Sequence, residues 1–293
     1  MKIALVMTLY NEHYLLENTL DSILGSSKYD CDVHINLSGP RFVEKNIECL
    51  QAIIEKDKNY KLYPFICGEE ICNHPIFTQE ELVHRCYYEL GYDVVVTGSP
   101  DYVFKEKDGF DVFMDKSLDY IDNKYMISCV SHEGSNVKFA FQIVTKKRLE
   151  EVGYIDKNFV PMGSSDVDLH RRCLLINNPG QDLEYYNSPE NFFNSPYGVN
   201  IVIPSDHLSY SEYGTLGIDC TNYFFKNSFD YFNKKYYYEK WGGRPGAGPN
   251  DPGTEKYVFP FNDSEISIKI SYEQRKSGYS KYDRGYLTLG SMI

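Results

Sequence analysis

Four groups of polar residues in this sequence have side chains that could bind a phosphorylated ligand and move a proton. Residues 8–12 (Thr-Leu-Tyr-Asn-Glu) follow an apolar run, and residues 99–101 (Ser-Pro-Asp) follow the β-branched run 93–98. An acidic stretch begins at Asp166, and His207 comes after a later apolar run. Carboxylate and imidazole groups can hold a divalent cation, and a further carboxylate can accept a proton from a hydroxyl group.

The elements that must position these groups follow from the hydrophobic pattern. Strands alternate with amphipathic helices, which predicts a layered α/β sheet with mainly parallel strands. Strands are expected at residues 2–8, 32–37, 61–66, 93–98, 125–130, 138–144 and 199–203. Because ligands bind at the carboxyl ends of the strands in open α/β sheets, residues 8–12 and 99–101 are expected at the binding edge.

Four helices are expected between these strands, and a fifth begins in the acidic stretch. The spacing of apolar residues predicts helices at residues 16–24, 43–54, 78–90 and 110–122. Thr78 and Glu81 form a predicted capping box at the start of the third helix. Ser164 or Ser165 is expected to cap the fifth, with acidic residues in its first turn, where the helix dipole favours negative charge.

The charge balance excludes some classes of partner. With 42 acidic and 30 basic side chains, the formal charge of -12 repels phosphate backbones and argues against nucleic-acid binding. A phosphorylated small ligand would need a local cation. The 27 tyrosines and 17 phenylalanines suit a core, an interface or carbohydrate contacts alike, and composition does not choose among these.

The sequence also carries signals on location and redox state. No window approaches the about 18 uncharged residues of a membrane-spanning helix, and the apolar run at residues 1–7 is too short for a signal sequence. The 8 cysteines lack the paired spacing of zinc sites, so reduced thiols are expected. These features predict a cytoplasmic protein without a transmembrane segment.

Two nucleotide-binding classes lack their signatures in this chain. Dinucleotide oxidoreductases carry Gly-x-Gly-x-x-Gly after the first strand, where this sequence has residues 8–12 instead. A P-loop nucleotidase would show Gly-Lys-Ser or Gly-Lys-Thr, which is also missing. Neither class therefore accounts for the four polar groups.

The sequence resembles a family 2 type glycosyltransferase with the GT-A fold. The match lies in residues 141–145, 149–159 and 165–169, which look like the acceptor-side segment of that family, and the four polar groups come in the family's order. The resemblance implies a mixed, mostly parallel sheet flanked by helices over residues 1–260. Residues 261–293 are then a C-terminal extension, basic and Tyr-rich from residue 272.

The resemblance implies an inverting, metal-dependent transferase of the hexosyltransferase kind. It would move a sugar from a nucleoside-diphosphate sugar, with a UDP-sugar favoured, to a hydroxyl of a glycan or glycoconjugate. Asp166 is the implied base, and Ser165 replaces the Glu that usually precedes it. Asp168 is expected either to hold structure or to bind acceptor hydroxyls. A base opposite the leaving group gives in-line displacement and hence inversion.

A divalent cation is implied at Asp101, with His207 as the second ligand. The family usually has two acids in this short motif, whereas Ser99 and Pro100 precede a single Asp here. Carboxylate and imidazole ligands suit Mn2+, and Mg2+ or a metal-independent site stays open.

Two sets of residues are implied to bind the nucleotide. Those at the strand ends are Thr8, Tyr10, Asn11, Glu12, Asn36 and Ser99. Lys240 and Arg244 are implied contacts of the diphosphate. Trp241 is assigned to the acceptor side and is expected to stack on a sugar or on the base. The Gly/Pro-rich loop at residues 242–253 is expected to close over the site.

Other interpretations stay open. Residues 8–12 could form a strand end and helix cap, and Asp101 could be an ordinary turn residue. Ser99 and Ser165, where the family has acids, leave room for a non-catalytic nucleotide-sugar or glycan binding protein. A sugar nucleotidyltransferase is a further alternative, but it would need a Gly-rich loop and a basic residue after the first strand, and residues 8–12 contain neither. A homo-oligomer is also left open by the tyrosine-rich C-terminal third.

Overall fold

The computed structural model describes residues 1–9, 12–38, 43–56, 58, 60–67, 75–131, 140–156, 165, 168–169, 172–173, 198–208, 237 and 284–286. The strands are β1 (Ile3–Leu9), β2 (Cys31–Leu37), β3 (Lys61–Cys67), β4 (Val94–Gly98), β5 (Tyr102–Phe104), β6 (Met126–Val130), β7 (Phe141–Val144), β8 (Gly198–Val202), β9 (Ser205–His207) and β10 (Arg284–Tyr286). Within this part of the chain, a sheet of 8 strands has the order β10-β3-β2-β1-β4-β7-β6-β8, and β5 pairs with β9 in a separate sheet.

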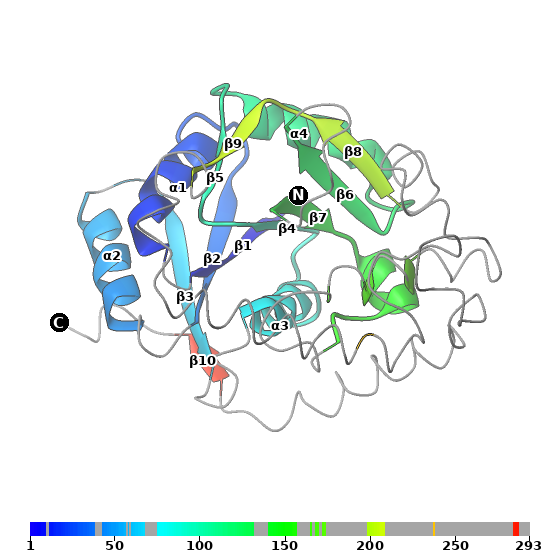
Figure 1. Ribbon diagram of the computed structural model, residues 1–293, viewed down its shortest axis with the longest axis horizontal. Helices are drawn as coiled ribbons and strands as arrows, with labels where there is room; N and C mark the ends of the chain where they lie inside the picture. The colour runs from blue at the N-terminus through cyan, green and yellow to red at the C-terminus, as the bar shows by residue number, and fades with distance from the viewer. Residues whose placement is uncertain are drawn as a thin grey trace, which may run out of the picture.

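Helices flank the main sheet on both faces (Figure 1). They are α1 (Leu16–Leu24), α2 (Val43–Glu55), α3 (Pro75–Tyr88) and α4 (Gly109–Ser117), with short turns η1 (His13–Leu15) and η2 (Leu118–Tyr120) and a π-helical turn η3 (Arg148–Val152). None of the described helices has the length and apolar character needed to cross a bilayer.

The apolar core has two layers because side chains alternate along β1. Ile3, Leu5 and Met7 point to the face covered by α1, α2 and α4, whereas Ala4 and Val6 point to the face covered by α3. All five are buried. A strand that is apolar on both faces is typical of the centre of a sheet with helices on each side.

The topology creates a switch point between β1 and β4. The parallel strands β2 and β3 lie on one side of β1, and β4 pairs with β1 in parallel on the other. Met7 is opposite Gly98, so the carboxyl ends of β1 and β4 are neighbours. Since β7 is antiparallel to both β4 and β6, the architecture confirms the predicted mixed, mostly parallel sheet with helices on both faces.

Some predicted elements differ in the structure. Helix α3 begins at Pro75, so the predicted capping box at Thr78 is wrong. Proline is tolerated in the first turn because the amide hydrogen it lacks has no partner there. The helix predicted at 110–122 ends as α4 at Ser117, followed by η2. The sequence did not predict β5, β9 or β10, and β10 places residues 284–286 of the C-terminal extension at the edge of the sheet beside β3.

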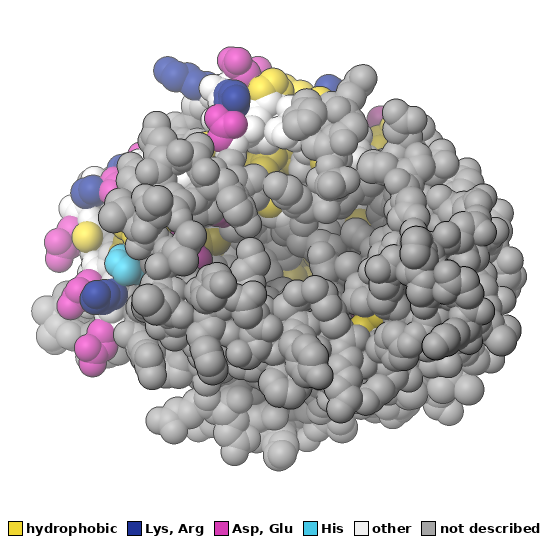
Figure 2. Space-filling model, viewed as in Figure 1, with side chains coloured by type: hydrophobic (Ala, Val, Ile, Leu, Met, Phe, Trp, Pro, Cys, Tyr) yellow, Lys and Arg dark blue, Asp and Glu magenta, His cyan; other side chains and the backbone are white. Residues whose placement is uncertain are grey.

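Charged side chains on the visible surface over α1 and α2 are of both signs (Figure 2). Lys56 Nζ lies 2.6 Å from Glu17 Oε2, and Lys58 Nζ lies 2.6 Å from Asp21 Oδ2. Exposed pairs of this kind contribute about 0–1 kcal/mol each to stability. This part of the surface is therefore mixed in charge despite the acidic composition.

A buried histidine lies on the α3 face of the sheet, toward the amino ends of the strands. His34 Nε2 lies 2.8 Å from the hydroxyl of Tyr92, which donates to Asp32 Oδ2 at 2.7 Å. The imidazole must therefore donate to the tyrosine oxygen. Burial lowers the pKa of His34 from 6.5 to about 4, against the opposing effect of Asp32 and with small contributions from Lys2 and Arg85.

This histidine is expected to make the fold sensitive to acid. Between pH 6.5 and about 4 the unfolded chain binds a proton at His34 that the folded chain does not, so stability falls as pH falls through this window. The expected loss is about 3 kcal/mol relative to His34→Gln, which keeps a donor for Tyr92. Urea unfolding of the wild type and His34→Gln at several pH values measures this loss. The same dependence of the free energy of unfolding on pH in both proteins would contradict the expectation.

Candidate functional site

The carboxyl ends of β1 and β2 are joined by polar contacts. Asn36 is opposite Thr8 in the strand register, and its Nδ2 donates to Thr8 Oγ1 at 3.2 Å. The carbonyl of Leu9 accepts from the amide of Ser38 at 2.9 Å and from Nδ2 of Asn46 at 3.2 Å. Two residues predicted to bind the nucleotide, Thr8 and Asn36, therefore lie side by side at this edge.

The segment after β1 turns into a short helix. Glu12 is partly buried, and its carbonyl accepts from the amide of Leu15 at 2.9 Å, which opens η1. Glu12 thus lies beyond the end of β1, as predicted. Tyr10 and Asn11 lie outside the described residues.

The turn after β4 holds Asp101 at the edge of the sheet. Ser99 Oγ donates to Asp101 Oδ1, and the amide of Ser99 donates to the carbonyl of Ala140 at 2.7 Å. The hydroxyl of Thr19, on α1, donates to the carbonyl of Pro100 at 2.5 Å. Contacts on both sides therefore fix the turn, and the Asp101 side chain is only 7% exposed.

The small sheet brings residue 207 next to Asp101. In the β5–β9 pair, Tyr102 is opposite His207, and the amide of Leu208 donates to the carbonyl of Asp101 at 2.9 Å. Tyr102 Oη also donates to Ser205 Oγ at 2.6 Å. Two residues that are far apart in the sequence thus have neighbouring backbones, although only the backbone of His207 is described.

No cluster of three or more His, Cys, Asp or Glu side chains that could hold a metal ion occurs in the described part of the chain. The carboxylate of Asp101 is the described group with both the chemistry and the location for such a ligand at the switch point. The described residues alone would therefore leave most of the coordination sphere of a cation to other groups.

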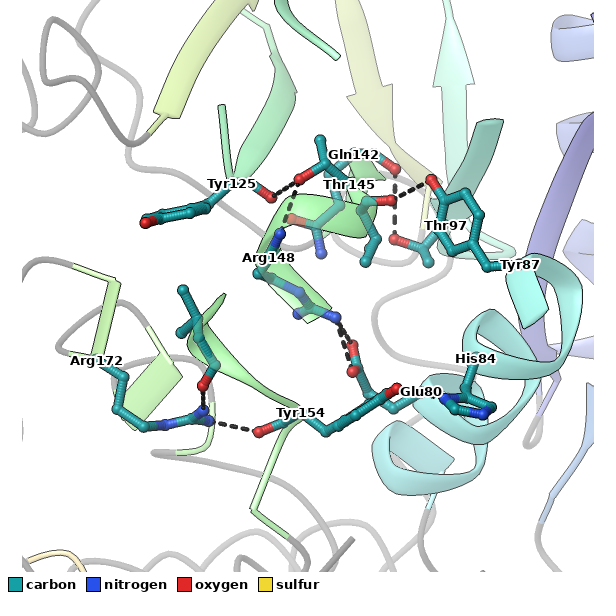
Figure 3. A network of polar contacts seen from close by, with 12 residues as sticks. Glu80, His84, Tyr87, Thr97, Tyr125, Gln142, Thr145, Arg148, Tyr154 and Arg172 are labelled. Atoms are coloured by element: carbon teal, nitrogen blue, oxygen red, sulfur yellow. Dashed lines mark hydrogen bonds and ion pairs between the residues drawn. The ribbon is translucent and has the colours of Figure 1, made fainter. Parts of the chain in front are cut away.

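The acidic stretch contains a buried ion pair. Asp168 and Arg172 are both 0% exposed, and Arg172 Nε donates to Asp168 Oδ2 at 2.9 Å. Arg172 also donates to the carbonyls of Val152, at 2.9 Å, and Tyr154, at 2.7 Å (Figure 3). Asp168 was expected either to hold structure or to bind acceptor hydroxyls, and this ion pair corresponds to the structural role. A contact with the acceptor stays a prediction.

Four of the predicted functional residues are in parts of the chain that the structure does not describe, in addition to Tyr10 and Asn11. They are Asp166, Lys240, Trp241 and Arg244. Asp166 directly follows Ser165, which is helical and 1% exposed.

A second buried ion pair joins Arg148 and Glu80, and the sequence did not predict it. Arg148 Nη2 donates to both carboxylate oxygens of Glu80, at 2.6 and 2.7 Å, and joins η3 to α3 (Figure 3). Nothing in the sequence connects these two residues. The one local signal is Thr145, whose Oγ1 accepts from the amide of Arg148 at 3.1 Å in the manner of a helix N-cap.

Loss of this pair is expected to destabilise the fold strongly. Glu80→Ala should lower the free energy of unfolding by about 3–5 kcal/mol, because it leaves a fully buried guanidinium without its carboxylate. The matched control is Glu89→Ala, directly after the last residue of the same helix, which removes a partly exposed pair with Arg85 and should cost at most about 1 kcal/mol. Denaturant unfolding measures both, and equal losses would contradict the expectation.

Polar side chains also form a row just inside the binding edge. Gln142 on β7 is opposite Thr97 on β4 and Ser128 on β6, and Ser128 is opposite Asn200 on β8. Ser128 and Gln142 are 1% and 4% exposed, and Ser128 Oγ and Gln142 Oε1 have no hydrogen-bond partner among the described residues. Oxygen atoms of this kind can accept hydrogen bonds from water or from a hydroxyl group.

Comparison with known proteins bears on the fold. No protein-family model matches the sequence, and neither does any curated protein. Among solved structures, the mannosyltransferase PcManGT from Pyrobaculum calidifontis, in complex with GDP-Man and Mn2+, aligns with 99% of this chain and 78% of its own at 12% identity, with a TM-score of 0.50.

Two other structures align less closely. S. aureus TarS 1-349 covers 96% of this chain and 92% of its own, at 10% identity and a TM-score of 0.43. The glucosyl-3-phosphoglycerate synthase from Mycobacterium tuberculosis covers 70% of each chain, at 11% identity and a TM-score of 0.41. The alignment with PcManGT, taken with the strand order, shows that this chain has the GT-A type of fold found in glycosyltransferases.

Proposed function

We propose that this protein is a family 2 type glycosyltransferase. It transfers a sugar from a nucleoside-diphosphate sugar to a hydroxyl group of a glycan or glycoconjugate. The observation that carries the proposal is the meeting of Asp101 and the backbone of residue 207 at the switch point, beside the end of β1. Fold alone does not decide function, so the proposal rests on this site.

The donor nucleotide binds across the ends of β1, β2 and β4. Thr8 and Asn36, joined by a hydrogen bond, offer polar groups at the first two strand ends, and Ser99 does so at the third. Tyr10, Asn11 and Glu12 complete the set, and Lys240 and Arg244 contact the diphosphate. UDP is the favoured nucleotide, as the resemblance to the family as a whole implies.

The residues at the switch point fit a divalent cation. The Asp101 carboxylate is held in place by Ser99 and the β4 turn, and residue 207 supplies an imidazole on the neighbouring strand. Oxygen and imidazole ligands suit Mn2+, with Mg2+ as the alternative, and the diphosphate would complete the shell. A cation bound there would neutralise charge on the leaving diphosphate.

Asp166 takes the proton from the attacking hydroxyl, and Trp241 belongs to the acceptor side. Asp168 supports this region through its buried pair with Arg172. Because the base and the leaving group lie on opposite faces of the sugar, the reaction inverts the anomeric centre. A carboxylate within hydrogen-bond distance of the nucleophile is sufficient for this step.

Release of nucleoside diphosphate tests the proposal. Incubation of the protein with a panel of nucleotide sugars, Mn2+ and glycan acceptors should release nucleoside diphosphate from at least one donor. Binding of nucleotide sugar without release, unchanged by Asp166→Asn, would instead identify a binding protein, the alternative that Ser99 and Ser165 leave open. Release of pyrophosphate from a sugar phosphate and a nucleoside triphosphate would identify a nucleotidyltransferase.

A further inference from the structure

The guanidinium of Arg172 connects two segments of the chain. All three of its nitrogen atoms donate hydrogen bonds, to Asp168 Oδ2 at 2.9 Å, the carbonyl of Val152 at 2.9 Å and the carbonyl of Tyr154 at 2.7 Å. Figure 3 shows Arg172 beside Tyr154. Asp168 and Arg172 are both helical, whereas Val152 is the last residue of η3 and Tyr154 lies two residues beyond it. The planar guanidinium therefore fastens the helical segment that carries Asp168 and Arg172 to the end of η3 in a fixed orientation.

Gly153 sets the relative direction of the two carbonyls that Arg172 binds. It lies between Val152 and Tyr154 and has φ 86° and ψ -159°, a conformation essentially restricted to glycine. Its amide donates to the carbonyl of Arg148 at 3.0 Å, which closes η3. A side chain at this position would therefore strain the backbone between the two carbonyls that bind the guanidinium.

The segment that carries these two carbonyls is in turn attached to helix α3. Tyr154 Oη and His84 Nδ1, on α3, form a hydrogen bond, and α3 packs on the sheet through Leu82, Val83 and Cys86. Through Tyr154 and α3, the helical segment is connected to the same sheet that carries Asp101. Its described residues, Ser165, Asp168, Leu169, Arg172 and Cys173, are all buried.

We propose that Arg172 is a positioning residue for the base, acting through this anchor, which we call the Arg172 clamp (Arg172, Asp168, Gly153 and the carbonyls of Val152 and Tyr154). The inference rests on the proposed function, because Asp166, two residues before Asp168, is the proposed base. A displacement of the base by about 1 Å costs about 10²-fold in rate. The clamp sets where the base stands relative to the donor, and it contributes nothing to nucleotide binding.

The test combines amide hydrogen exchange with steady-state kinetics. Arg172→Lys keeps the charge beside Asp168 but loses the planar set of donors. Exchange over residues 165–173 should become faster, and kcat should fall by about 10²-fold while KM for the nucleotide sugar stays within about twofold. Gly153→Ala should reproduce both effects and serves as the second variant if Arg172→Lys does not fold.

Two controls separate positioning from a general loss of stability. Gly91→Ala also places a side chain on a residue with positive φ, 68°, where a Cβ atom meets nothing within 4 Å, and it should leave kcat unchanged. Arg148→Lys weakens the other buried arginine pair and should lower the melting temperature without the same fall in kcat.

Each outcome decides the inference. Unchanged exchange over residues 165–173 in both clamp variants would overturn the clamp, whatever the activity. If Arg148→Lys and Arg172→Lys lose the same stability and the same kcat, Arg172 has only a structural role. If the wild-type protein releases no nucleoside diphosphate, the proposed function fails and the positioning role fails with it, while the exchange data still decide the anchor.

Discussion

Replacement of Asp166 with Asn is expected to lower the rate of sugar transfer by about 10²–10⁴-fold, the range that general-base catalysis contributes. The amide keeps the shape of the side chain but cannot take the proton from the acceptor hydroxyl. Because Asp166 is proposed to act on the acceptor, the affinity for the donor nucleotide should not change. Release of nucleoside diphosphate in the presence of acceptor, together with calorimetric titration of UDP, measures the two quantities.

The matched control for this variant is Asp119→Asn. Asp119 is an exposed carboxylate in η2, and its replacement should leave the transfer rate unchanged. A transfer rate in Asp166→Asn within about threefold of the wild type would be far below the contribution of a general base and would remove Asp166 from that role.

Asp101→Ala is expected to abolish Mn2+-dependent nucleotide binding. Asp101 is the described carboxylate at the switch point, and a cation held there is worth several kcal/mol to the binding and departure of a diphosphate. Titration of UDP with and without Mn2+ should show an affinity gain with metal in the wild type and none in the variant. Metal-free binding should be similar in both proteins if the nucleotide contacts of β1 and β2 are intact.

The matched control for Asp101→Ala is Asp206→Ala. Asp206 lies in β9 beside His207, but its carboxylate is half exposed and pairs with Lys105 at 3.1 Å. Its loss should leave the Mn2+ effect in place. An undiminished Mn2+ effect in Asp101→Ala, in a protein with a wild-type melting curve, would show that the cation is bound elsewhere.

The long elements of the fold could be predicted because their patterns are local. Helix α1 begins and ends at the predicted residues, Leu16 and Leu24, because its apolar residues repeat at helical spacing and Gly25 follows. Strand β1 begins and ends one residue later than predicted, and β2 begins one residue earlier. Each of these segments carries enough apolar residues to show its period.

The short elements depend on partners that are distant in the sequence. Strands β5, β9 and β10 have three residues each, too few to show a period, and each exists through pairing with a remote strand. Long-range pairing is the kind of information that a local pattern does not contain.

The candidate site divides in the same way. Asp101 could be found because it lies in the turn after a buried β-branched strand, and strand ends are where such sheets bind ligands. Its proximity to residue 207 required the β5–β9 pair. Arg148 and Arg172 could not be distinguished from surface arginines in the sequence, because charged residues are mostly exposed and their burial depends on remote acceptors.

A crystal structure of the protein with UDP and Mn2+, with anomalous diffraction to locate the manganese, would show whether Asp101 binds the cation. We expect a manganese ion bound by the Asp101 carboxylate, with the His207 imidazole as a further ligand and the diphosphate completing the shell. The uracil and ribose should lie against Thr8 and Asn36. Manganese and nucleotide bound away from the ends of β1 and β4, or a nucleotide whose diphosphate does not approach Asp101, would contradict it.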